Sequence, residues 1–158
     1  MTQEETISHA ELDDILTRLD SSKGALIAVL EASDPEKFNK ESPDGETVKH
    51  SLERTADDIN FYYGRLVARA LNLPQPPCLQ GAEFGSLIEG TMALQVAHRR
   101  FTNLLHDLVP GDLDKVAEEP ELGRYTLRQL LEMAAAQYNL RASQVKRLAG
   151  PKPRQRRA

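Results

Sequence analysis

The strongest constraint on the fold is the spacing of apolar residues, which recur every three or four positions through four long segments of the chain. This spacing places them on one face of an α-helix, because an α-helix has 3.6 residues per turn. The segments run at about 8–32, 46–72, 83–108 and 126–149. We therefore predict an all-α domain, a four-helix bundle in which the apolar stripes are turned inward.

Local signals set the ends of these helices. Capping boxes are predicted at Ser8 with Glu11 and at Thr126 with Gln129, where each pair of side chains satisfies free backbone N–H groups at a helix start. No segment alternates apolar and polar residues long enough to indicate a strand, so the connector before Thr126 is expected to hold at most a helical turn at 113–117. Segments containing proline or glycine separate the helices, at 33–35, 43–45, 73–77, 110–112 and 150–151.

The chain has 158 residues, which suits one domain. We expect residues 1–150 to form the bundle and residues 151–158 to form a basic, disordered tail, because the tail has no large apolar residue to bury. The only cysteine, Cys78, excludes an internal disulfide. No apolar run approaches the ~20 residues that span a bilayer, and the first residues are polar, so we expect a cytoplasmic protein without membrane contact. An acidic body with a basic end also argues against nucleic-acid binding.

The most informative polar residues are Gln137 and Arg141, which fall four residues apart on the apolar face of the last helix. Two such positions pointing into a bundle suit a His-x-x-x-His metal site, but an arginine has no lone pair to donate to a metal. Two interpretations of Arg141 stay open. Its charged end either extends to water from the edge of the stripe, or it turns inward and pairs with Glu53, Asp57 or Asp58 of the second helix.

Three segments together resemble the DinB-like superfamily. Residues 47–57 resemble the opening of its second helix, residues 121–132 the entry to its last helix, and residues 144–148 the end of that helix. The resemblance covers nearly the whole chain in helix order and length. It implies a four-helix bundle, often dimeric, with a divalent metal held by three histidines, one from the second helix and two from the last. Characterised relatives resemble thiol S-transferases, isomerases that use a thiol cofactor, and a domain of a thiol-histidine biosynthetic enzyme.

This sequence departs from the family pattern at all three ligand positions, where Arg54, Gln137 and Arg141 stand in place of histidine. Two guanidinium groups near the site would also repel a dication. The four histidines of the chain include no pair at the i, i+4 spacing, and His98, on the apolar face of the third helix, is interpreted as structural. We therefore predict that the protein binds no metal and no cofactor.

Two functions are compatible with these residues. The first is a non-catalytic protein that binds a small anionic ligand or a partner, and the resemblance adds a homodimer. The second is a thiol-dependent S-transferase or hydrolase-like enzyme that reuses the family cavity, with an arginine holding an anionic substrate. We favour the first because the sequence contains no recognisable pair of nucleophile and base. Tyr62 and Tyr63 are interpreted as packing residues. The candidate binding residues are Arg54, Asp57, Asp58, Gln137, Tyr138 and Arg141.

Overall fold

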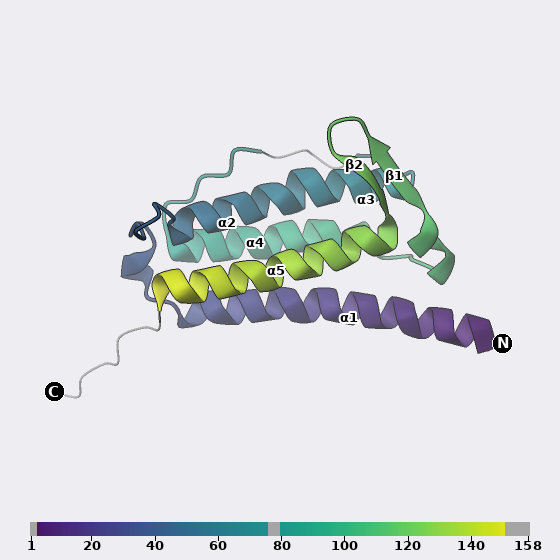
Figure 1. Ribbon diagram of the computed structural model, residues 1–158, viewed down its shortest axis with the longest axis horizontal. Coiled ribbons are helices and arrows are strands. Elements are labelled where there is room, and N and C mark those ends of the chain that lie inside the picture. Colours follow the sequence, from purple (N-terminus) through teal and green to yellow (C-terminus); the bar gives the residue numbers. More distant parts are fainter. Residues whose placement is uncertain (1–2, 76–79, 151–158) are drawn as a thin grey trace.

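The computed structural model describes residues 3–75 and 80–150, so Cys78 and the predicted tail 151–158 lie outside the described residues. The described chain is mostly helical, with one small two-stranded sheet. Three of its elements, α2, a π-helical turn (η2) and α3, follow one another without a break and form a single rod. The helices are α1 (Gln3–Ala32), α2 (Val48–Asp57), η2 (Asp58–Tyr63), α3 (Gly64–Ala70), α4 (Leu87–Asn103) and α5 (Leu127–Ala149), as labelled in Figure 1.

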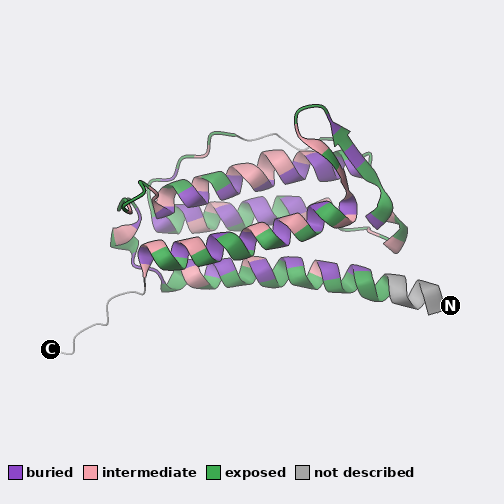
Figure 2. Cartoon of the chain, in the orientation of Figure 1, coloured by how far each residue is buried: buried purple, intermediate pink, exposed green. Residues whose placement is uncertain are grey.

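Four helical rods therefore pack around one core. The α2–α3 rod contacts α4 on one side and α5 on the other, and α5 also packs along α1. In Figure 1, α1 and α5 run in one direction while the α2–α3 rod and α4 run in the opposite direction. Each rod turns an inner row of buried side chains toward the others and an outer row toward solvent (Figure 2). Among the described residues, no helix combines the length and the apolar character needed to cross a membrane.

The helix ends match the sequence signals in part. Thr126 caps α5, and its side chain and that of Gln129 form the predicted capping box. The capping box predicted at Ser8 is wrong, because α1 already begins at Gln3 and Ser8 lies within it.

The expectation of a helical domain is confirmed in its broad form, but the expectation that the chain contains no strand is wrong. Strand β1 (Val116–Glu119) pairs antiparallel with β2 (Gly123–Thr126) in the connector between α4 and α5, after a short 3-10 helix at Pro110–Asp114. Each strand has four residues, which is too short for alternation to be recognised in the sequence. The hairpin is anchored by tertiary contacts instead. Ala117 is fully buried, and the buried Glu119 carboxylate accepts a hydrogen bond from Arg65 of α3 at 2.8 Å.

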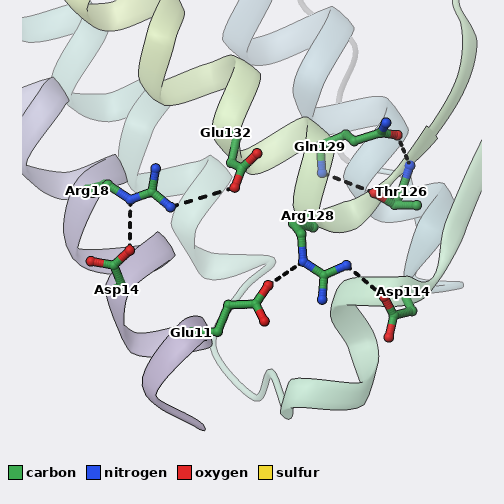
Figure 3. Close-up of polar contacts among 8 residues, drawn as sticks. All are labelled: Glu11, Asp14, Arg18, Asp114, Thr126, Arg128, Gln129 and Glu132. Atoms are coloured by element: carbon green, nitrogen blue, oxygen red, sulfur yellow. Dashed lines mark hydrogen bonds and ion pairs between the residues drawn. The ribbon is translucent and has the colours of Figure 1, made fainter. Parts of the chain in front are cut away.

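Ion pairs fix α5 to its neighbours close to the hairpin (Figure 3). The Arg128 guanidinium, at the start of α5, contacts Glu11 of α1 and lies 2.7 Å from Asp114, just before β1. One turn further along α5, Glu132 faces Arg18 of α1 at 3.6 Å. These pairs are partly exposed, so each contributes under about 1 kcal/mol, and they orient α5 more than they stabilise it.

Candidate functional site

A polar cluster lies where the π-helical turn meets the middle of α5. The Gln137 amide donates a hydrogen bond from Nε2 to Oδ2 of Asp58 at 2.8 Å. A guanidinium nitrogen of Arg141, one turn further along α5, lies 3.7 Å from the same oxygen. At this distance the two groups form an ion pair, but they are too far apart for a hydrogen bond. Arg54 lies one turn before Asp58. We call these four residues the arginine cluster: Arg54, Asp58, Gln137 and Arg141.

Arg141 has the most unusual environment of the four. Its side chain is buried, with 6% of the residue exposed, so the charged end does not extend to water. One terminal nitrogen donates to the Gln144 side chain at 2.9 Å, whereas Nε forms no hydrogen bond with any described residue. Burial, and next the charge of Arg54, lower the pKa of Arg141, while Asp58 opposes that shift. The buried guanidinium is therefore incompletely paired.

The charges of the cluster do not balance. Asp58 is the one carboxylate shared by two guanidinium groups, since its pKa responds to both Arg141 and Arg54. Burial raises the pKa of Asp58, and both arginines oppose that effect. Arg54 is exposed and Asp58 is partly exposed, so the cluster opens to solvent on the side of α2. Two guanidinium groups beside one carboxylate favour an anion, an effect that the nearby Glu46 and Asp57 carboxylates partly oppose.

Three tyrosines border the cluster toward the hairpin. The Tyr62 and Tyr63 rings pack edge to face with their centroids 5.0 Å apart. Burial and then the Asp58 carboxylate raise the pKa of Tyr63 to about 12. Burial and then neighbouring Tyr125 of β2 raise the pKa of Tyr62, whose hydroxyl donates weakly to the Leu122 carbonyl at 3.4 Å. Sequence reasoning missed Tyr125, because only the hairpin brings it to this place.

The predicted site residue Asp57 and the predicted Arg141 partner Glu53 point elsewhere. Asp57 accepts hydrogen bonds from the backbone N–H groups of Gly81 and Ala82, at 3.2 and 3.0 Å. Glu53, one turn before, accepts from the Phe84 N–H at 2.9 Å. Both carboxylates thus hold the segment that leads into α4. Of the three acidic partners proposed for Arg141, only Asp58 faces it.

Tyr138 lies in the core rather than in the cluster. Its hydroxyl is 2.8 Å from Nδ1 of His98, and Nε2 of His98 is 3.1 Å from the Asp20 carboxylate of α1. Burial raises the pKa of Tyr138 and lowers the pKa of His98, whose shift Asp20 partly opposes. This chain of contacts ties α5 to α4 and α1. In this structure Tyr138 is 1% exposed and contacts the core rather than Asp58, Gln137 or Arg141.

Across residues 3–75 and 80–150, no three His, Cys, Asp or Glu side chains are grouped so that they could hold a metal ion. His9, His50 and His106 are exposed and lie on different elements. Comparison with protein-family models, curated proteins and solved structures finds no match to this chain. The chemistry of the site therefore has to be argued from its own residues, and these favour anion binding.

Proposed function

We propose that this protein is a non-catalytic, DinB-like helical bundle that binds a small carboxylate ligand at the arginine cluster. The observation that carries the proposal is the buried guanidinium of Arg141 with its unpaired Nε. The three histidine positions of the resemblance correspond to Arg54, Gln137 and Arg141, so the proposal places an anion where the family would hold a metal.

The incompletely paired edge of Arg141 supports a carboxylate as the ligand; because Nε is itself buried, the ligand would enter by displacing a neighbouring side chain. One terminal nitrogen is used by Gln144, which leaves Nε without a partner and the other terminal nitrogen with only a 3.7 Å contact to Asp58. These two nitrogens form one edge of the guanidinium. The two oxygens of a carboxylate match such an edge with two parallel hydrogen bonds. A bound carboxylate would also balance the second positive charge of the cluster.

The absence of a suitable base supports binding rather than catalysis. Beside the cluster, the phenol of Tyr63 has its pKa raised to about 12, so it stays protonated at neutral pH. Asp58 is already held by Gln137. The thiol-dependent transferase or hydrolase considered above requires a base that can activate a nucleophile beside the substrate. We therefore favour a binding protein.

The test follows the Nε–H of Arg141 by NMR during titration with benzoate, acetate and inorganic phosphate. We expect a saturable shift of this resonance that is larger for the carboxylates than for phosphate. The assignment comes from Arg141→Met, which should lose both the resonance and the binding. Arg147→Met is the matched control, because Arg147 is an exposed arginine on the same helix, and it should bind like the wild type. An Arg141 resonance that no anion shifts would refute the proposal, and so would unchanged binding by Arg141→Met.

We also propose that the protein is a homodimer. The resemblance supports this, and so do large apolar side chains that remain exposed on the outer face of α4. Sedimentation over a wide range of protein concentration tests it, and a monomer at every concentration would contradict it.

A further inference from the structure

An apolar stripe runs along the outer face of α4. Ile88, Met92 and Val96 are 69%, 63% and 46% exposed. They are four residues apart, so they lie in a row along one side of the helix. The row borders a groove of about 320 Å³ whose opposite wall is formed by Leu30 and Glu31 of α1 and by Pro35, three residues after the end of α1. In Figure 1, α4 lies behind α2 and α5, so this face is turned away from the arginine cluster.

The two ends of α4 carry opposite charges. Glu89 is exposed in the first turn, and Arg99 and Arg100 are exposed near the end of the helix. Arg99 falls on the same side of the helix as the apolar stripe, at 100° per residue, and Glu89 lies at its edge. A second α4 laid antiparallel against the first would place acidic ends beside basic ends.

We propose that two copies of this chain pair through α4, antiparallel, around a two-fold axis that passes beside Met92. This inference rests on the homodimer proposed above and specifies where its subunits meet. Ile88 of each copy packs against the partner's Val96, and the two Met92 side chains meet on the axis. Arg99 of each copy lies near the partner's Glu89. The helix dipoles are then also antiparallel.

The pattern favours a second copy over an unrelated partner, because a two-fold interface must be complementary to itself. The stripe has one large apolar residue four positions before Met92 and another four positions after it, so it is the same in both directions. The charges at its ends differ in sign, which is what antiparallel self-pairing requires. The groove beside the stripe gives the flexible Met92 side chain space to adjust.

Disulfide trapping tests the geometry. In a Cys78→Ala background the introduced cysteine is the only thiol. Met92→Cys should oxidise to a covalent dimer, because the two positions meet at the axis. Ile88→Cys alone should not, because two copies of residue 88 would be about 12 Å apart along the helices at 1.5 Å per residue, too far for a disulfide. Mixing Ile88→Cys with Val96→Cys should restore the covalent dimer. Efficient trapping by Ile88→Cys alone, or none by Met92→Cys, would overturn the proposed pairing.

Sedimentation separates this inference from the homodimer itself. Met92→Glu should be monomeric at concentrations where the wild type is dimeric. Leu140→Glu is the control, because Leu140 is 53% exposed on α5, outside the stripe, and its dimer should persist. Arg99→Glu should weaken the dimer, and adding Glu89→Arg should restore it. A dimer that survives Met92→Glu would refute the α4 interface but keep the homodimer, whereas a wild type that never dimerises refutes both.

Discussion

Replacing Arg141 with methionine should leave the protein as stable as the wild type or raise its unfolding free energy by about 1 kcal/mol. An unsatisfied buried donor costs about 1–3 kcal/mol, and Nε of Arg141 is such a donor. The substitution removes that cost while keeping an unbranched apolar stem in the core. It does not leave Asp58 unpaired, because Gln137 still donates to this carboxylate and 38% of its side chain is exposed.

In Arg141→Met, the free energy lost with the interactions of Arg141 is smaller than, or equal to, the free energy gained by removing its unsatisfied Nε. The hydrogen bond to Gln144 contributes about 1 kcal/mol, and the 3.7 Å contact with partly exposed Asp58 contributes under about 1 kcal/mol. Arg141→Ala should behave differently, because it also removes the buried stem. At about 0.8 kcal/mol per methylene, the alanine variant should be about 2 kcal/mol less stable than the methionine variant. The expected order of stability is methionine, then wild type, then alanine.

Urea denaturation at neutral pH measures these differences, provided that the slope with denaturant stays constant across the variants. Arg147→Met is again the control and should change the unfolding free energy by less than about 0.5 kcal/mol, as most exposed positions do. A loss of about 3–5 kcal/mol in Arg141→Met would mean that the ion pair with Asp58 dominates and that its removal strands a buried charge. That result would refute the argument from the unpaired Nε. The expected result would show that Arg141 lowers the stability of the folded protein, as is common for residues kept for binding.

Three further predictions concern the metal, the glycines and pH. The purified, untagged protein should contain no stoichiometric zinc, nickel or iron by elemental analysis, and about one metal per chain would contradict this. Gly24→Ala should raise the unfolding free energy by about 1 kcal/mol, because Gly24 lies in α1 with open space around it. Gly90→Ala should lower it, because the added Cβ would lie 3.0 Å from a Leu52 methyl. Equal effects of the two substitutions in thermal melts would contradict this packing. Burial lowers the pKa of His98 below 6.5, so the unfolded chain binds the extra proton first and stability should fall as the pH drops below about 6.5. His98→Gln should flatten that slope in urea melts from pH 7 to pH 5, and an unchanged slope would contradict the assignment.

The helices could be predicted from the sequence because their apolar stripes are long. The rods around the core follow the four segments with three- and four-residue spacing, and the capping box at Thr126 fixed the start of α5. The hairpin could not be predicted. Its strands are four residues long and are held by Glu119 and Ala117, which contact elements distant in the sequence. Local propensity contains no information about such contacts.

The residues that α5 contributes to the candidate site could be predicted from the sequence, but those of the α2–α3 rod could not. The spacing placed Gln137 and Arg141 on the apolar face of the last helix and left open whether Arg141 turns inward; in the structure both side chains contact Asp58. On the opposite side, the resemblance pointed to Arg54, which is exposed, and the side chain that meets Gln137 is Asp58, one turn later.

The neighbouring residues Asp57 and Asp58 show which further information was needed. Consecutive side chains on a helix point about 100° apart, so these two carboxylates must serve different neighbours. Asp57 faces the segment before α4, and Asp58 faces α5. Periodicity predicts that they diverge but not which neighbour each one meets, since that depends on the order of the helices around the core. The α2–α3 rod contacts both α4 and α5, and α4 lies parallel to it (Figure 1). Asp58 therefore belongs to the proposed binding site, whereas Asp57 holds the segment before α4, although the two residues are adjacent in the sequence.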